Sequence, residues 1–242
     1  MDGVTLIVPV HNEESIVVDN GLALIEYLRS RFGEEYEFLL IDNGSTDGTM
    51  DEVRRLERKD GHVRGLHIDR RSLGEAIKLG ILEARKEYGV FYPIDLEPEM
   101  DFIGKSVAAA KEQRADVVIG LRSFEEGSLN RPARRAVLSR AYRVATAVLL
   151  GVKLPDSQSA CLFRIETVGP LSRVISGSSL AFSAILLYLS YKHDMGVVEI
   201  PVRVTNKRVS SRVKLIRDSA RTFGGIVGFR LGELVGRSKI AK

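Results

Sequence analysis

Three carboxylates stand close together in the segment Asp95-Leu96-Glu97-Pro98-Glu99, which directly follows an apolar run. Asp95 and Glu97 are one residue apart, and an irregular turn would let both side chains face one cation. Mg²⁺ and Mn²⁺ prefer such oxygen ligands and often share them with a substrate diphosphate. The segment indicates a divalent metal site with Asp95, Glu97 and Glu99 as candidate ligands. The alternative is a solvated acidic loop.

A second polar segment, Asp42-Asn43-Gly44-Ser45-Thr46-Asp47-Gly48-Thr49, is rich in glycine and short polar side chains. Glycine lets a backbone approach a ligand closely, and Asp or Asn can accept hydrogen bonds from a base or a ribose. These properties suit a nucleotide-binding loop. The alternative is an Asx-type turn that precedes a helix.

Basic side chains form two further groups, and arginine is well suited to bidentate contacts with phosphate. The first group is Arg122, Arg131, Arg134 and Arg135; the second is Arg208, Arg212 and Lys214, together with the hydroxyl of Ser211. Either group could bind the phosphates of a ligand, or it could be solvated surface charge.

The charge of the 242-residue chain is unevenly distributed. The net charge is +4, but the stretch from Arg203 to the end holds 11 basic and 2 acidic residues, a net of +9. Such a tail favours an anionic partner, for example a membrane surface or a phosphate, over a neutral one, although it could also be a solvated face. Because the basic charge is confined mainly to the tail, and the aromatic residues show no nucleic-acid pattern, we expect no nucleic-acid partner.

Several classes of protein are excluded. Cys161 is the only cysteine, so no disulfide framework or cysteine-rich metal site can form. The chain has no Walker A loop and no G-x-G-x-x-G motif, which disfavours P-loop NTPases and dinucleotide oxidoreductases. The four histidines are scattered, which favours core or surface roles over metal ligation. The run Val4–Val10 lacks the basic flank of a signal peptide, and no run reaches the roughly 18–20 apolar residues of a spanning helix.

Strand-like and helix-like segments alternate through the first half of the chain. We expect strands at 4–10, 37–41, 63–68, 90–94 and 117–120, and helices at 12–31, 49–58, 74–88 and 102–114, with Asn12 as the first helix N-cap. Repeated βα units predict an α/β fold: one domain with a mostly parallel central sheet flanked by helices. The polar segments follow strand ends, so they should converge on one crevice at the carboxyl edge of that sheet.

The second half is less regular. We expect a helix over 134–150, a loop over 154–159, a short strand over 161–165 and an apolar helix over 180–191. A strand over 197–204 contains Pro201, which predicts a place near the sheet edge. We divide the chain into a domain over 1–211 and a basic C-terminal tail over 212–242 that could associate with a membrane.

In this order, the motifs resemble those of the family 2 glycosyltransferases with the GT-A fold. They are Val8-Pro9-Val10-His11-Asn12-Glu13-Glu14, Ile41–Thr49, Leu73-Gly74-Glu75-Ala76 and Asp95-Leu96-Glu97. The later segments Gly120-Leu121-Arg122, Asp156-Ser157-Gln158-Ser159 and Glu199–Arg203 resemble the dolichol-phosphate mannose synthase branch, which glycosylates polyprenyl phosphates.

The resemblance implies a nucleotide-sugar donor, Mg²⁺ or Mn²⁺, and inversion at the anomeric carbon. It implies a base and ribose site at Pro9, His11, Glu13, Asp42 and Gly74, and a metal site at Asp95, Glu97 and Glu99. Phosphates of donor and acceptor would meet Arg122, Arg131, Arg134, Arg208, Ser211 and Arg212. The chain departs from the family at Glu97 and Asn43, where Asp is frequent, and at Ser183-Ala184-Ile185, where an acidic residue often follows the aromatic.

The implied reaction is transfer of a sugar, from a donor of the GDP-mannose or UDP-glucose type, to a polyprenyl (dolichyl) phosphate. A phosphate acceptor is already anionic, whereas a hydroxyl acceptor would need a base, for which Asp156 is our candidate. The helices over 134–150 and 180–191 and the basic tail would lie on the membrane, and we expect a cytoplasmic protein peripheral to its cytoplasmic face. Alternatively, both helices are core or form a homodimer. The competing functions are a non-catalytic nucleotide-sugar-binding partner protein and, less favoured, a sugar nucleotidyltransferase.

Overall fold

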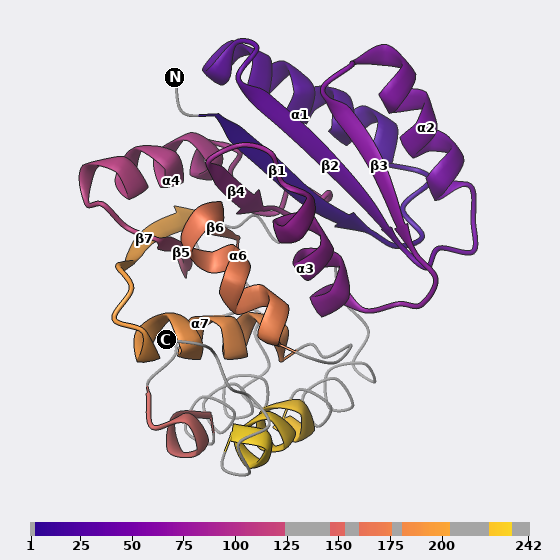
Figure 1. Ribbon diagram of the computed structural model, residues 1–242. Coiled ribbons are helices and arrows are strands. Elements are labelled where there is room, and N and C mark those ends of the chain that lie inside the picture. Colours follow the sequence, from indigo (N-terminus) through magenta and orange to yellow (C-terminus); the bar gives the residue numbers. More distant parts are fainter. Residues whose placement is uncertain (1–2, 124–145, 153–159, 176–180, 204–222, 234–242) are drawn as a thin grey trace.

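A mixed sheet of seven strands, in the order β3-β2-β1-β4-β6-β5-β7, organises the computed structural model (Figure 1). The structure describes residues 3–123, 146–152, 160–175, 181–203 and 223–233. The strands are β1 (Val4–Val10), β2 (Tyr36–Asn43), β3 (Val63–Ile68), β4 (Tyr88–Phe91), β5 (Val117–Ser123), β6 (Cys161–Arg164) and β7 (Val197–Arg203). The helices are α1 (Val17–Phe32), α2 (Thr49–Lys59), α3 (Leu73–Glu83), α4 (Asp101–Glu112), α6 (Ile165–Val174) and α7 (Phe182–Lys192), with further helix over 146–150 and 223–233.

The pairing of the strands confirms the mostly parallel sheet. β1 pairs in parallel with β2 and β4, β2 with β3, and β5 with β7. Only β6, among the described strands, runs antiparallel to its neighbours β4 and β5. β7 is an edge strand, as Pro201 predicts, because proline has no N–H to offer a further neighbour.

Both faces of β1 are buried, which is why its sequence is a continuous apolar run. Leu6 and Val8 pack on one side with α1, α2 and α4, whereas Ile7 packs on the other side with α3, α6 and α7. At Gly80 of α3 a side chain would collide with Ile7, so glycine lets this helix lie close against the sheet.

The first loop differs from the prediction. The helix begins at Val17 rather than Asn12, and the N-cap position belongs to Ile16. Asn12 has a φ of 54°, and its Oδ1 accepts a hydrogen bond of 2.8 Å from the Thr46 N–H. The assignment of Asn12 as N-cap is wrong because its side chain satisfies the backbone of the neighbouring loop instead.

Two other boundaries also differ. α3 ends at Glu83 rather than at residue 88, and β4 begins at Tyr88 and ends at Phe91. α6 was not predicted; it contains Pro170 after Gly169, two residues that weaken a helical pattern.

The apolar helix predicted over 180–191 is α7, and it belongs to the core. Its side chains from Ala184 to Ser190 are buried, so the prediction that this helix lies on a membrane is wrong. Helix 223–233 packs against it, since Glu233 bonds the Tyr188 hydroxyl at 3.2 Å and Lys192 at 2.6 Å. None of the helices in the described ranges is long and apolar enough to cross a bilayer.

A buried carboxylate joins α1, β2 and the start of β3 at the amino edge of the sheet, away from the polar loops. Asp60 accepts hydrogen bonds from the Tyr36 hydroxyl at 2.6 Å, the Arg29 guanidinium at 3.0 Å and the His62 N–H at 2.8 Å. Burial alone would raise the pKa of the Asp60 carboxyl, but the bonds from Tyr36 and His62 outweigh it and hold the pKa below its ordinary value.

We expect Asp60→Asn to lower the free energy of unfolding at pH 7 by about 2 kcal/mol. Because the folded pKa is depressed, this contribution is present above the unfolded pKa of about 3.9 and is lost as the pH falls through the folded value. Urea unfolding between pH 7 and pH 3 should therefore show a shrinking difference from the wild type. The control is Asp51→Asn, whose exposed pair with Arg54 should contribute under about 1 kcal/mol. Equal losses for the two variants would contradict the assignment.

Candidate nucleotide and metal site

The candidate site lies where β1, β2 and β4 end. These strands are parallel neighbours with β1 in the middle, so their carboxyl ends meet at one edge of the sheet. Pro9 lies within β1 and His11 and Glu13 follow it; Asp42 ends β2 with Asn43; Asp95 follows β4. The structure therefore brings the predicted nucleotide and metal residues to the same edge.

The loop after β1 and the loop after β2 are joined by hydrogen bonds. The Asn12 N–H donates to Ser45 Oγ at 3.0 Å, and the Glu13 N–H donates to Thr49 Oγ1 at 2.8 Å. In return, Glu14 Oε2 accepts from the Gly48 N–H at 3.1 Å. Each loop thus satisfies backbone groups of the other, which holds both in one conformation.

Asp42 is the buried centre of the second loop. Its exposed fraction is 1%, and its Oδ1 accepts from the Ser45 N–H at 3.2 Å. The Asx-type turn that the sequence allows before the helix is formed by Asp47, whose Oδ1 accepts from the Thr49 N–H at 3.1 Å. Its Oδ2 lies 2.7 Å from His67 Nδ1, and the β2–β3 register pairs these two residues. His67 is thus a neighbour of the site that the sequence analysis missed, and strand register is the signal that would have found it.

Asn43 connects this loop to the start of α3. Its Oδ1 accepts from the Ser72 N–H at 2.5 Å, and its carbonyl oxygen lies 3.0 Å from His11 Nδ1. Ser72 then caps α3, accepting from the Glu75 N–H at 3.3 Å, with Gly74 buried in the first turn. Gly44 has a φ of 68°, and a Cβ atom there would lie 2.9 Å from the backbone nitrogen of Arg71, so both the conformation and the surroundings of this residue require glycine.

The acidic segment after β4 forms a tight loop. Asp95 Oδ1 accepts from the Glu97 N–H at 3.1 Å, and Leu96 between them has a φ of 55°. Asn20 of α1 donates to the Ile94 carbonyl at 2.9 Å, which anchors the start of the loop. Glu97 and Glu99 line a depression of about 460 Å³ together with Tyr27 and Met100.

These carboxylates suit a cation that is shared with a substrate. In the parts of the chain that the structure describes, no three His, Cys, Asp or Glu side chains are grouped closely enough to hold an ion. Asp95 and Glu97 are partly exposed, whereas Glu99 lies 3.9 Å from the Arg203 guanidinium. Mg²⁺ is commonly bound by one or two carboxylates plus substrate phosphates, and Asp95 and Glu97 fit that arrangement.

The predicted phosphate-binding residues are only partly within the described structure. Arg122 lies near the carboxyl end of β5, and β5 runs parallel to β4 because β6 is antiparallel to both. The backbone of Arg122 therefore lies at the same edge of the sheet as Asp95. The remaining residues, Asp156, Arg131, Arg134, Arg208, Ser211 and Arg212, lie outside the described residues.

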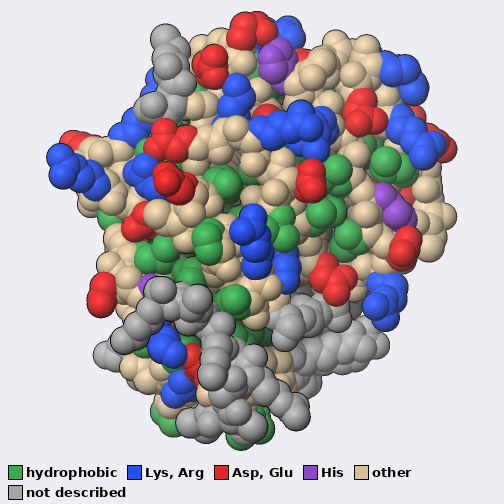
Figure 2. Space-filling view, viewed as in Figure 1, with side chains coloured by type: hydrophobic (Ala, Val, Ile, Leu, Met, Phe, Trp, Pro, Cys, Tyr) green, Lys and Arg blue, Asp and Glu red, His purple; other side chains and the backbone are tan. Residues whose placement is uncertain are grey.

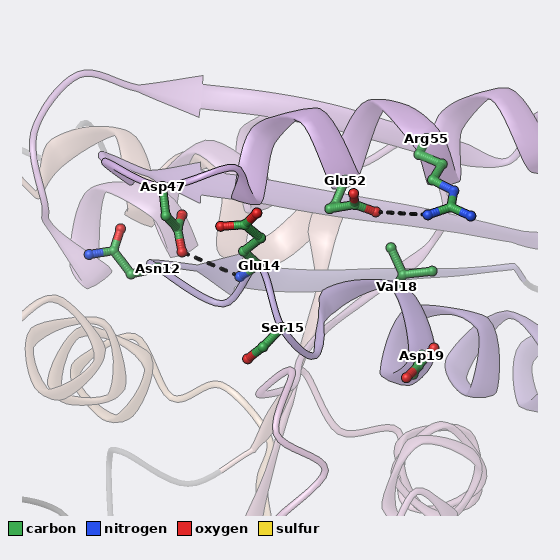
Figure 3. Close-up of a pocket in the computed structure, with 8 residues that line it drawn as sticks. All are labelled: Asn12, Glu14, Ser15, Val18, Asp19, Asp47, Glu52 and Arg55. Carbon is green, nitrogen blue, oxygen red and sulfur yellow. Dashed lines mark hydrogen bonds and ion pairs between the residues drawn. The ribbon is translucent and has the colours of Figure 1, made fainter.

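A second depression, of about 610 Å³, lies between the first turns of α1 and α2 (Figure 3). Its lining carries Glu14, Asp19, Asp47 and Glu52, and the only cation among its lining residues, Arg55, is 3.4 Å from Glu52. This lining repels phosphate groups. On the face shown in Figure 2, by contrast, acidic and basic side chains are interspersed.

Comparisons with known proteins agree with this geometry. A family model described as glycosyl transferase family 2 matches residues 5–167. Dolichyl-phosphate beta-glucosyltransferase of Dictyostelium discoideum is 28% identical over 250 residues, 98% of this chain and 76% of that protein. The protein of the same name from Saccharomyces cerevisiae is 22% identical over 254 residues, 96% of this chain and 75% of that protein.

Glycosyltransferase AglD of Haloferax volcanii is 25% identical over 218 residues, 89% of this chain, but the chain spans only 35% of that longer protein. Among solved structures, glucosyl-3-phosphoglycerate synthase from Mycobacterium tuberculosis in complex with UDP superposes with a TM-score of 0.69. The two are 17% identical, and the match covers 96% of this chain and 80% of that one, so this likeness shows the fold.

The family match begins in β1, includes the loops after β1, β2 and β4, and extends into α6. The matched residues make up more than half of the chain. The α/β fold with its mostly parallel sheet agrees with that match. The chain therefore belongs to glycosyl transferase family 2.

Proposed function

We propose that this glycosyltransferase moves a sugar, with inversion, from a nucleotide-sugar donor to a polyprenyl phosphate, with a divalent metal ion. The observation that carries the proposal is the placement of the Asp42–Thr49 loop and the Asp95–Glu99 loop at the ends of strands that flank β1. A nucleotide in the first loop would extend its diphosphate across β1 toward the second. The names of the two dolichyl-phosphate relatives support the acceptor class.

The donor would lie along the interlocked loops. Pro9, His11, Glu13, Asp42 and Gly74 would line the base and ribose site, with Asp42 fixed by Ser45 and His67. UDP-glucose is the first donor we propose, because two relatives are named glucosyltransferases and similar folds hold UDP and UDP-glucose. GDP-mannose is the alternative that the motif pattern also allows.

In the proposed reaction, an oxygen of the acceptor phosphate attacks the anomeric carbon as the bond from that carbon to the diphosphate oxygen breaks. Asp95 and Glu97 would hold Mg²⁺ or Mn²⁺, and the ion would offset the negative charge that grows on the departing nucleoside diphosphate. The acceptor phosphate is already anionic near neutral pH, so it needs little help from a base. Arg122, Arg131, Arg134, Arg208, Ser211 and Arg212 would bring the two anions together.

A different acceptor would change the chemistry. A hydroxyl acceptor would require a base, and Asp156 is the candidate. A protein with the same loops but no turnover would be a nucleotide-sugar-binding partner. Both alternatives keep donor binding and differ in where the sugar goes.

The decisive experiment supplies the purified protein with liposomes that carry a polyprenyl phosphate, with Mn²⁺ and with a panel of labelled nucleotide sugars. We expect label in the organic phase with one donor and its loss with EDTA. Label transferred only to a small hydroxyl acceptor would replace the acceptor assignment. Nucleotide binding without transfer to either acceptor would favour the non-catalytic partner.

We propose that residues 1–211 form the glycosyltransferase domain and that the basic tail over 212–242 attaches the protein to the cytoplasmic face of a membrane. Val148 and Leu231, 77% and 57% exposed, come from two segments that touch, since Arg230 Nε donates to the Leu149 carbonyl at 3.1 Å. Basic residues precede both segments in the sequence. Apolar anchors beside basic charge suit an anionic lipid surface, where each nearby Lys or Arg contributes about 1 kcal/mol. A second copy of the chain is the alternative partner for these side chains.

We expect the protein to float with liposomes that contain phosphatidylserine at low salt and to be released at high salt. Val148→Asp with Leu231→Asp should reduce flotation severalfold, and the exposed pair Leu22→Asp with Leu82→Asp serves as control. Two outcomes would contradict membrane docking. In the first, the wild-type protein stays wholly in the lower fraction at low salt. In the second, the wild-type protein is a dimer that dissociates when Val148 and Leu231 are changed.

The metal assignment of Asp95 can be tested by substitution. We expect Asp95→Asn to lower the rate of metal-dependent transfer about 100-fold or more, equivalent to about 3 kcal/mol of activation free energy. The reason is that the metal ion that would stabilise the leaving diphosphate loses one of its protein ligands. The control is Glu35→Gln, whose exposed carboxylate lies 2.9 Å from Lys86 Nζ directly before β2, at the opposite edge of the sheet. Unchanged transfer by Asp95→Asn would remove the metal assignment.

The length and charge of the second carboxylate, Glu97, can be tested in the same way. We expect Glu97→Gln to raise the Mn²⁺ concentration for half-maximal transfer at least tenfold, and Glu97→Asp to fall between this variant and the wild type. Glu97→Gln removes the negative charge, whereas Glu97→Asp keeps the charge but shortens the side chain by one methylene group. Wild-type behaviour of Glu97→Gln in a Mn²⁺ titration would show that Glu97 is no ligand.

A further inference from the structure

Tyr92 is a buried tyrosine that is attached to the acidic loop. It directly follows β4, and its side chain is fully inaccessible to solvent. Its hydroxyl donates a hydrogen bond to the carbonyl of Pro98, which is itself buried. A single side chain thus connects the start of the loop to its far end, across Asp95 and Glu97.

The conformation between these two ends is unfavourable by itself. Leu96 has a φ of 55°, in the left-handed region that leucine rarely occupies. Such a conformation persists only where the surroundings impose it. Leu96 packs against the core on the α1 and α4 side, and the Tyr92 bond closes the loop beyond it.

The remaining ties are at the borders of the loop. Asn20 holds the Ile94 carbonyl at 2.9 Å, and the Glu99 N–H donates to the Arg203 carbonyl at 3.1 Å. Within the loop, Asp95 and Glu97 bond each other, which shapes the turn but does not attach it to the domain. The Tyr92 hydroxyl, by contrast, donates from the core to the backbone directly beside Glu97.

The chemistry of the hydroxyl suits a permanent donor. Burial raises the pKa of Tyr92, and the charges of Asp95, Tyr27 and Glu99 raise it further. The group therefore keeps its proton at any physiological pH. A carbonyl left without this donor would be a buried, unpaired acceptor.

We infer that Tyr92 is a positioning residue, which holds the Asp95–Glu99 loop through the Pro98 carbonyl and so fixes the backbone that carries Asp95 and Glu97. The consequence for metal binding rests on the function proposed above. Tyr92 does not touch the ion or the substrate. It fixes the backbone from which the carboxylates project, so its loss should weaken the metal-dependent part of nucleotide binding and leave the metal-independent part intact.

The test compares Tyr92→Phe with Tyr36→Phe. Each removes one hydroxyl from a fully buried tyrosine, but the Tyr36 hydroxyl bonds Asp60 at the opposite edge of the sheet. Hydrogen exchange of the amides in 94–99, measured without metal, reports on the loop. UDP binding, measured in EDTA and over a Mn²⁺ titration, reports on the site.

For Tyr92→Phe we expect exchange over 94–99 at least tenfold faster, a Mn²⁺ midpoint about tenfold higher, and UDP affinity in EDTA within twofold of the wild type. Tyr36→Phe should show a lowered melting temperature and none of these changes. A melting temperature is recorded for both variants, so a general loss of stability is recognised by its appearance in both.

Equal exchange of the loop in the two variants would overturn the positioning role. Faster exchange with an unchanged Mn²⁺ midpoint would overturn its link to the metal. If the UDP affinity of the wild-type protein does not change with the Mn²⁺ concentration, the metal site of the proposed function is refuted, and with it the metal part of this inference. The exchange experiment would still decide whether Tyr92 positions the loop.

Discussion

The burial of β1 on both faces is the constraint on which the rest of the structure depends. A strand with Leu6 and Val8 on one face and Ile7 on the other needs helices on both sides of the sheet. Parallel neighbours connected by crossover helices meet that need, and β2 and β4 are those neighbours. Parallel strands end at the same edge, so the polar segments after β1, β2 and β4 are brought together by the packing of residues that have no chemical role themselves.

The loops at this edge keep their shape by satisfying one another. Ser45, Thr49 and Asp42 accept from backbone N–H groups, while Asn12 and Glu14 do the same from the opposite loop. A loop that is ordered before the ligand arrives loses less conformational entropy on binding. The glycines and short polar residues of Asp42–Thr49 thus stabilise the loop itself, and the turn and the proposed nucleotide-binding loop are the same structure.

The sequence predicts those features that depend on local pattern. The apolar runs and their βα alternation identify β1, β2, β3 and β5 and the parallel sheet, and Pro201 identifies the edge strand. Errors arise where a distant partner decides the outcome. Asn12 has the side chain of an N-cap, but Thr46, 34 residues away, offers its N–H instead. The pairing of Asp42 with His67 depends on the register of two strands, which no local pattern contains.

The geometry of the acidic loop also constrains how an ion and a nucleotide can depend on each other. Asp95 and Glu97 offer two carboxylates, and in the described structure no third acidic side chain, cysteine or histidine joins them. A hard cation with two protein ligands is completed by phosphate oxygens and water, so ion and diphosphate must each raise the affinity for the other by the same factor. The depression between α1 and α2 offers the diphosphate no alternative place, because Glu14, Asp19, Asp47 and Glu52 line it. In the proposed function, an ion held by Asp95 and Glu97 would attract the diphosphate across β1, so the position of these two carboxylates would decide how well ion and diphosphate support each other.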